Sequence, residues 1–393
     1  WSEWEQTHAE RLAQEAHSKF GHLKNWEDIR PDAENPQNYI SGLACDHYQR
    51  FAEDFELAAS LNHNAHRFSI EWSRIEPEEG QFDAAAIAHY RQILLELNKN
   101  SLEPFVTLWH WTLPLWLRDE GGVASGRFPF YFERYTRHVV SQLNHLVKFW
   151  IPLNEPTSVI GNSYITGQWP PQKKSFFLAF RTYHILAKAH KYAYHTIHQI
   201  NPGAQVGLAN LLHSFEPYRR RSLLDKMMVH LVHFFTNTYF LRLTKGTHDF
   251  LCVQYYFHNR FKFPRKVHQE DKPTSDLGWE IYPRGIYNIL KELERYRLPI
   301  YITENGLADA HDEQRTQFIR EHLLWIHTAI NDGVDVRGYF YWSLLDNFEW
   351  DKGFWPHFGL VAIDYSTQTR TIRDSARAYA KICEENAVEM ENI

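Results

Sequence analysis

The sequence contains little of what marks secreted, membrane-spanning or nucleic-acid-binding proteins. Only three cysteines occur among 393 residues (Cys45, Cys252 and Cys383), and such an odd, sparse set argues against a disulfide framework and favours a reducing compartment. No apolar run is long enough to span a bilayer and no secretory signal is recognisable, so we expect a cytoplasmic protein that does not enter the membrane. The formal net charge is -6, which gives no reason to expect nucleic acid as a partner.

Linkers, low-complexity tracts and signs of a second domain are also missing, so residues 1–393 are predicted to form a single domain. Aromatic residues, in contrast, are abundant: 14 Trp, 21 Tyr and 26 Phe make up 16% of the chain. These rings either fill a large core or, in part, line a site where the C–H faces of sugars stack on indoles. Composition alone leaves both interpretations open.

Short apolar runs alternate with helical segments along the chain, which indicates parallel strands joined by helical crossovers. Before residue 65 we expect a helix over Trp4 to Lys19, then an irregular stretch through Asn35-Pro36, and no strand. The fold class is therefore α/β, a (β/α)8 TIM barrel, although such a barrel requires eight strands and its first is not evident here. The seven recognisable runs are centred near residues 66, 105, 149, 206, 251, 301 and 339.

Two of these runs end in a glutamate. One reads Tyr301-Ile302-Thr303 followed by Glu304-Asn305-Gly306, and the other ends in Asn154-Glu155-Pro156. In a parallel barrel, residues at the carboxyl ends of strands face the mouth of the active site. A pair of carboxylates at such ends is what glycoside hydrolysis requires of a protein.

The two carboxylates would need opposite environments. A Glu155 that donates a proton near neutral pH needs a raised pKa, from burial or a nearby negative charge, while Asn154 could bind a sugar hydroxyl. A nucleophilic Glu304 must stay ionised, and Arg67 and Tyr256 are its candidate donors. Alternatively, Glu155 simply begins a helix, Arg67 forms an ion pair inside the barrel, and the ring of Tyr256 packs in the core.

Further candidates for a sugar site lie near other strand ends. His110, between Trp109 and Trp111, could bind hydroxyl groups; no metal is expected there because no other histidine or carboxylate has ligand spacing with it. The segment from Trp342 to Trp350 carries two indoles and a third carboxylate, Glu349, which could also bind sugar. The alternative is that this segment is a packed loop with no role in binding.

Taken together, these motifs resemble glycoside hydrolase family 1, the β-glucosidase and β-galactosidase family on the (β/α)8 fold. The resemblance runs from about Cys45 to Ala376. The matching stretches are His66 to Arg74 (HRFSIEWSR), His110-Trp111, Asn154-Glu155-Pro156, Tyr255-Tyr256, Gly278 to Pro283 (GWEIYP), Thr303-Glu304-Asn305-Gly306 and Trp342 to Trp350.

The resemblance implies a role for each of these positions. Glu155 would be the general acid/base and Glu304 the nucleophile, about 5–5.5 Å apart as in retaining enzymes. Supporting residues would be Arg67, Asn154 and Tyr256. The remaining positions would bind substrate, with Trp279 beside the aglycone: His110, Trp111, Trp279, Trp342, Glu349, Trp350 and Phe358.

The sequence also departs from the family. Nothing in the sequence matches the family's first strand or the glutamine on that strand, which binds hydroxyl groups of the sugar. In addition, Gln254 stands where the family has an asparagine, whose side chain is one methylene shorter. The segment between the strands near 206 and 251 is short and basic, which would reshape the rim of the barrel. Members that act on 6-phosphorylated sugars have a small polar residue at the position of Glu349, whose carboxylate would repel phosphate.

The sequence therefore predicts a retaining β-glycosidase, most similar to β-glucosidases, acting on small unphosphorylated β-D-glucosides, with β-galactosides and β-fucosides as secondary substrates. It would use no cofactor, because both catalytic groups are carboxylates. A catalytically weak sugar-binding protein with an incomplete barrel and a transglycosylase remain as alternatives. The sequence does not determine the aglycone or the oligomeric state.

Overall fold

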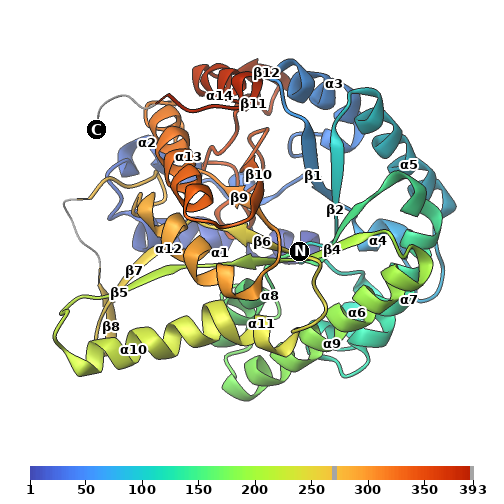
Figure 1. Cartoon of the computed structure of the whole chain (residues 1–393), viewed down its shortest axis with the longest axis horizontal. Helices are drawn as coiled ribbons and strands as arrows, with labels where there is room; N and C mark the ends of the chain where they lie inside the picture. Colours follow the sequence, from blue (N-terminus) through green and yellow to red (C-terminus); the bar gives the residue numbers. More distant parts are fainter. Residues whose placement is uncertain (268–271, 390–393) are drawn as a thin grey trace.

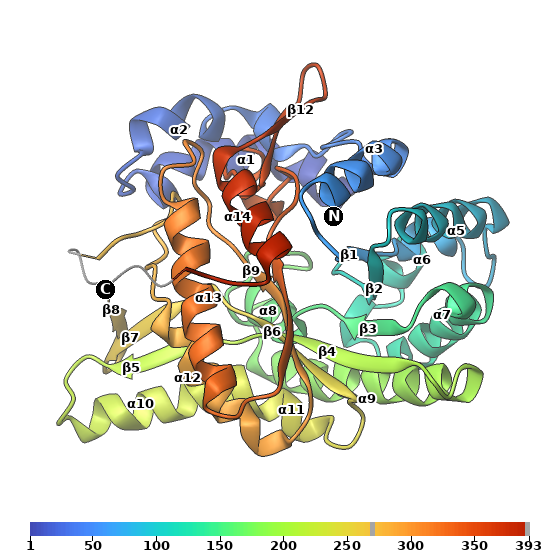
Figure 2. The same ribbon diagram turned by 45° about the horizontal axis from the view of Figure 1, so that its top comes forward.

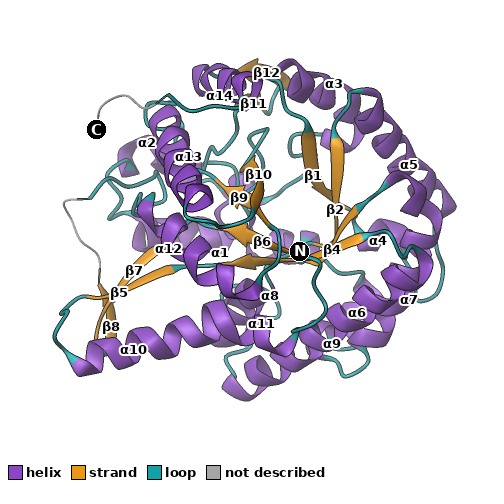
Figure 3. Cartoon of the chain, in the orientation of Figure 1, coloured by secondary structure: helices purple, strands orange, loops and turns teal. Residues whose placement is uncertain are grey.

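In the computed structural model, which describes residues 1–267 and 272–389, seven parallel strands form one sheet that curves almost into a closed barrel (Figure 1). Neighbouring strands are in the order β1-β2-β3-β4-β6-β9-β10, and helices surround them (Figure 3). All seven strands predicted from the sequence are present. Their bounds are β1 (Ala65–Ser69), β2 (Glu103–Trp109), β3 (Phe149–Leu153), β4 (Gln205–Leu211), β6 (Phe250–Gln254), β9 (Ile300–Asn305) and β10 (Val336–Tyr341).

Helices cross between successive strands, as the alternating pattern predicted. Asp83 and Ser175 begin two of the long ones, because their side chains accept hydrogen bonds from backbone N–H groups of the first turn. The bounds are α1 (Ser2–Phe20), α2 (Trp26–Ala33), α3 (His47–Ser60), α4 (Trp72–Ile75), α5 (Ala84–Lys99), α6 (Leu115–Asp119), α7 (Phe128–Leu143), α8 (Pro156–Val159), α9 (Phe176–Ile200), α10 (Leu223–His233), α11 (Tyr239–Leu243), α12 (Arg284–Leu293), α13 (Arg315–Asn331) and α14 (Asp374–Glu385).

Helix α2 is the main correction to the expected elements, because the stretch it occupies was predicted to be irregular. Its interior contains Pro31, a residue that normally argues against a helix. Tertiary packing outweighs this preference: Trp26, Ile29 and Ala33 are all buried, in a cluster that includes Trp355.

Two small sheets were also not predicted. One contains β5 (Ser214–Pro217), β7 (His258–Lys262) and β8 (Arg265–Val267), and the other contains β11 (Val361–Asp364) and β12 (Thr369–Ile372). These strands are three to five residues long. Such short segments carry little periodicity of their own, so their pairing follows from the tertiary structure.

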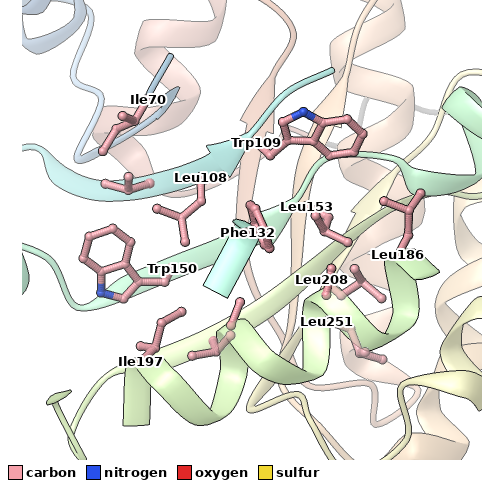
Figure 4. Packing of buried hydrophobic residues seen from close by; sticks show 14 of the residues in the cluster. Ile70, Leu108, Trp109, Phe132, Trp150, Leu153, Leu186, Ile197, Leu208 and Leu251 are labelled. Atoms are coloured by element: carbon pink, nitrogen blue, oxygen red, sulfur yellow. The ribbon is translucent and has the colours of Figure 1, made fainter. Parts of the chain in front are cut away.

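The largest hydrophobic cluster lies between the strands and the helices that cover them. Figure 4 shows Trp150, Leu153 and Leu208 from the strands facing Phe132 of α7 and Ile197 of α9. The abundance of aromatic residues is thus partly explained by core packing. Among the described residues, no helix is both long and apolar enough to cross a membrane.

The barrel is open on one side, between β1 and β10. No described strand pairs with the outer edge of either, whereas the inner edges pair with β2 and β9. Every residue of β1, at one edge of the sheet, is partly exposed. In contrast, every residue of β6, in the interior of the sheet, is buried. Helices α3 and α14 lie on the open side (Figures 1 and 2). The sequence contains no recognisable first strand, and accordingly no described strand lies between β1 and β10.

Candidate active site

Glu155 and Glu304 lie at the carboxyl ends of β3 and β9, two strands that are separated in the sheet by β4 and β6, and each is 5% exposed. Glu304 is within β9, and Glu155 follows β3 immediately before α8. The backbone of Glu155 has a φ of 41°, a left-handed conformation that costs about 1–3 kcal/mol for a residue with a side chain. Its N–H bonds the Ala209 carbonyl at 2.9 Å, which holds the turn in place.

Three donors surround the carboxylate of Glu304. Arg67 Nη1 lies 2.5 Å from Oε1, Gln254 Nε2 also donates to Oε1, and the Tyr256 hydroxyl donates to Oε2 at 3.0 Å. The donors come from β1, β6 and the residues just after β6, so the curvature of the sheet brings them together. Such a set of donors favours the ionised carboxylate.

Asn154, which follows β3 and precedes Glu155, connects the donors of Glu304 to the end of β3. Its Oδ1 accepts hydrogen bonds from Arg67 and from Gln254 Nε2 (2.8 Å), which leaves its Nδ2 to donate to His110 Nε2 at 3.1 Å. His110 Nδ1 then carries the proton and lies 3.0 Å from the Ser69 hydroxyl. Burial, together with the charge of Arg67, holds the pKa of His110 well below its usual range, so the ring is neutral at pH 7.

The environment of Glu155 is different. Its Oε2 accepts a hydrogen bond from the Ser158 hydroxyl at 2.8 Å, and none of the described cations forms an ion pair with it. Burial raises the pKa of Glu155 well above its usual range, and the negative charge of Glu304 adds to the rise. Glu155 is therefore the carboxyl of the pair that retains its proton towards neutral pH.

Burial raises the pKa of Glu304 too, but the charge of Arg67 and the hydrogen bonds from Arg67, Tyr256 and Gln254 oppose that rise. The two carboxyl groups influence each other through space, so only one of them is readily ionised at a time. Because the cation and the donors are on Glu304, the negative charge is expected there.

Glu349 is a third carboxyl near this pair, close enough for its charge to raise the pKa of Glu155. Burial raises the pKa of Glu349 itself to about 7, against the opposing charge of Lys352. Lys352 Nζ is held 2.9 Å from Asp351, which also accepts a hydrogen bond from the Trp169 indole at 2.9 Å. Lys352 is therefore paired with Asp351 and is not a free cation.

Indole rings form one wall beside these groups. The Trp111 ring lies 4.8 Å from that of Trp350 and 4.6 Å from that of Trp169, and its Nε1 donates to the Asn154 carbonyl at 2.9 Å. Trp1 packs on the same wall, 4.8 Å from Trp350. The Trp342 ring is 6.4 Å from His110.

A second aromatic group lies next to Tyr256. The Trp279 ring is 5.9 Å from Tyr256 and 6.1 Å from Phe358. Phe358 is buried with Trp355 in the cluster that also contains parts of α2, while Trp279 and Tyr256 are partly exposed at its border.

Eight of the twelve predicted site residues form one hydrogen-bonded or charge-coupled group: both glutamates, Arg67, Asn154, Tyr256, His110, Trp111 and Glu349. Sequence reasoning treated Gln254 as a departure and did not include it in the site, although it donates to both Glu304 and Asn154. Although the side chain of Gln254 is one methylene longer than an asparagine, its amide nitrogen reaches an oxygen of each residue. Ser69 and Ser158 were also missed, since a lone serine carries no distinguishing pattern.

Comparison with known proteins identifies the family of the chain. The family model of glycosyl hydrolase family 1 matches residues 21–264 and 241–388. The chain belongs to glycosyl hydrolase family 1. It is 34% identical to Beta-glucosidase A of Thermotoga maritima over 93% of this chain and 92% of that protein, which makes it a β-glucosidase-like glycosyl hydrolase.

Solved structures of the family have the same fold. A beta-glycosidase from Pyrococcus horikoshii superposes with a TM-score of 0.84 at 36% identity, covering 88% of this chain and 86% of that one. The beta-glucosidase from Thermotoga maritima in complex with glucoimidazole gives a TM-score of 0.84 at 32% identity, over 95% of this chain and 92% of that one. The architecture of this family 1 member is thus the one expected from its sequence motifs.

Gly306, two residues after Glu304, provides a test of how tightly the site is packed. A Cβ added there would lie 1.8 Å from the Trp342 carbonyl oxygen, a backbone atom that a side-chain rotation cannot move. We expect Gly306→Ala to lower the free energy of unfolding by about 1–3 kcal/mol. Gly161→Ala is the matched control, because nothing lies within 4 Å of its Cβ position. Urea denaturation of both variants measures the difference, and equal stabilities would contradict the close approach.

Proposed function

We propose that this family 1 member is a retaining β-glycosidase that hydrolyses small unphosphorylated β-D-glucosides, and secondarily β-galactosides and β-fucosides, by double displacement. Glu304 is the nucleophile and Glu155 the general acid/base. The observation that carries this assignment is the asymmetry of the pair. A cation and two further donors hold Glu304, whereas Glu155 is buried beside the negative charge of Glu304 with a single hydroxyl described as its donor.

In the first step, an oxygen of Glu304 attacks the anomeric carbon of the sugar. The bond from that carbon to the glycosidic oxygen breaks, its electron pair goes to the oxygen, and Glu155 transfers its proton there. The products are the free aglycone alcohol and a covalent glycosyl ester on Glu304. Because Glu304 loses its negative charge on forming the ester, one cause of the raised pKa of Glu155 is removed.

In the second step, Glu155 acts as a base. It takes a proton from water, whose oxygen attacks the anomeric carbon and displaces Glu304 as a carboxylate. Two inversions at the same carbon leave its configuration unchanged. Arg67, Tyr256 and Asn154 serve both steps by fixing the nucleophile and stabilising its charge when it departs, and Gln254 shares this role through its two hydrogen bonds.

The remaining residues bind the substrate. His110, Trp111, Trp342, Glu349 and Trp350 hold the glycone, with neutral His110 able to exchange hydrogen bonds with hydroxyl groups. Trp279 and Phe358 flank the aglycone beside Tyr256. Glu349 disfavours a phosphorylated sugar, since its carboxylate would repel a phosphate and the nearby Lys352 is paired with Asp351.

The test is hydrolysis of p-nitrophenyl β-D-glucoside, with the first product followed by proton NMR. A retaining enzyme releases the β-anomer of glucose before mutarotation mixes the two forms. Initial release of the α-anomer would contradict the proposal. Measuring glucose against p-nitrophenol separates hydrolysis from transfer, because equal amounts indicate that water is the acceptor and a deficit of glucose indicates another sugar.

A further inference from the structure

The segment between β3 and β6 contains most of the large apolar side chains that the described part of the protein exposes, and α10 is the clearest case. Seven of the eleven residues of α10 are apolar, yet its only buried residue is Asp225. Arg219 and the backbone N–H of Phe263 donate hydrogen bonds to Asp225 and hold it on the inner side of the helix. Four of the apolar residues are more than half exposed: Leu223, Leu224, Met227 and Leu231. The exposed face of α10 is therefore largely apolar, whereas that of an ordinary surface helix is polar.

The beginning of α9 continues this surface. Phe176 is 81% exposed and Phe177 is 74% exposed. The ring of Phe180, one turn further on, lies 6.2 Å from that of Tyr239, which in turn lies 5.6 Å from the ring of Phe235, just after α10. Helices α9, α10 and α11 lie along the same lower edge of the molecule in both views, away from the open side of the barrel (Figures 1 and 2). The exposed side chains of residues 176–180 and 223–235 thus form one surface, which we call the α9–α10 surface.

Positive charge is concentrated around this surface. Residues 156–248 contain eleven Lys and Arg but only two Asp and Glu, a local excess of nine positive charges in a chain whose net charge is -6. Arg219-Arg220-Arg221 precedes α10, and Lys173-Lys174 precedes α9. Arg219 pairs with Asp225, and the other four cations are exposed without an ion-pair partner among the described residues. Glu216, the second acidic residue, is paired with Arg260. The net charge of the whole chain therefore conceals a strongly positive region.

An apolar surface that is bordered by cations fits an anionic lipid bilayer. Apolar and aromatic side chains enter the boundary between headgroups and acyl chains, while Lys and Arg pair with the phosphate groups at the level of the headgroups. A second copy of this chain fits less well, because a two-fold contact through this surface would bring the positive excess of both copies together. Nucleic acid would use the cations but would leave the apolar side chains without a partner.

From these observations we propose that the α9–α10 surface binds the surface of an anionic lipid bilayer, peripherally and reversibly. This binding brings the mouth of the barrel close to the lipid. Trp169, four residues before Lys173, lies 6.5 Å from Trp350 in the indole wall of the candidate active site. The proposal rests on the exposed apolar and charged side chains and does not depend on the assignment of the glycosidase reaction.

The test is flotation of the intact protein with vesicles of phosphatidylcholine that contain about 30% phosphatidylserine, compared with vesicles of phosphatidylcholine alone. At about 0.1 M salt, partitioning to the anionic vesicles should exceed partitioning to the neutral ones by about tenfold or more, and it should weaken as the salt concentration rises. No flotation with the anionic vesicles, or equal partitioning to both kinds, would overturn the proposal.

The apolar part of the surface is tested by the double variant Leu224→Ser/Leu231→Ser. The two leucines are 53% and 54% exposed, so the fold should tolerate the change, as thermal melting verifies. Partitioning should weaken about tenfold or more, because two leucine side chains no longer enter the lipid. Leu43→Ser/Leu95→Ser is the matched control, since these leucines are 74% and 44% exposed outside this surface, and it should partition like the parent. Equal partitioning of the two double variants would contradict the assignment.

The charged part is tested by Lys226→Gln, which removes an exposed cation from α10. Partitioning to the anionic vesicles should weaken about fivefold. Lys24→Gln, an exposed lysine outside this surface, is the control and should change nothing. Two further results would overturn the proposal in favour of another partner. A doubled mass in light scattering that Leu224→Ser/Leu231→Ser reverses, without flotation, would assign the surface to contact between copies. Binding of polyglutamate without flotation would assign it to an acidic protein.

Discussion

Glu304→Gln is expected to lower kcat/KM for p-nitrophenyl β-D-glucoside by about 10⁴-fold or more, which corresponds to about 5 kcal/mol of transition-state stabilisation. The amide is nearly isosteric with the carboxylate, so the cavity and its neighbours change little. It cannot, however, form the covalent glycosyl intermediate as a carboxylate does. It also removes the negative charge that Arg67 pairs with.

The matched control is Glu27→Gln, which removes the same charge from a side chain that is 83% exposed on α2. This variant should retain the activity of the parent. Thermal melting of both variants shows whether either has lost its fold. A folded Glu304→Gln protein with activity within tenfold of the parent would rule out Glu304 as the nucleophile.

Glu155→Gln is expected to separate substrates by their leaving groups. A glutamine cannot donate a proton, so an alkyl β-glucoside, whose leaving oxygen needs one, should lose about 10²–10⁴-fold in kcat/KM. A 2,4-dinitrophenyl β-glucoside leaves without protonation and should lose far less. The measurement is a series of aryl β-glucosides whose phenols span a range of pKa. An equal loss across the series would show that Glu155 is not the acid.

The pH profile provides a second readout for the same variant. The proton-donating form of Glu155 must be present, and its raised pKa keeps that form populated towards neutral pH. Activity of the parent on poor leaving groups should therefore fall as the pH rises through the pKa of Glu155. In Glu155→Gln the residual activity on the same substrates should no longer show this alkaline decline, because the amide does not titrate. An unchanged decline would assign it to another group, for example Glu349, whose pKa is raised to about 7.

The seven barrel strands could be predicted from the sequence because each is a compact apolar run bounded by helical or turn segments. The two glutamates could be located for the same reason: Asn154-Glu155-Pro156 and Glu304-Asn305-Gly306 mark the places where strands stop. Helix α2 and the small sheets could not be predicted, since their residues have weak or contrary local preferences. They depend on segments distant in the sequence: Trp26 and Ile29 of α2, for example, are buried in one cluster with Trp355.

What the sequence by itself determined was the order of strands and helices, the identity of the two carboxylates and the likeness to family 1. Local patterns are sufficient for these, because strand ends in a parallel barrel meet at one mouth. Only the tertiary structure decided which side chains surround each carboxylate and thus what favours a negative charge on Glu304. Burial and charge depend on neighbours from other strands, and Arg67 of β1 and Gln254 of β6 reach Glu304 of β9 only when the sheet curves. The same curvature stops one strand short of closure, so that no described strand pairs with the outer edges of β1 and β10.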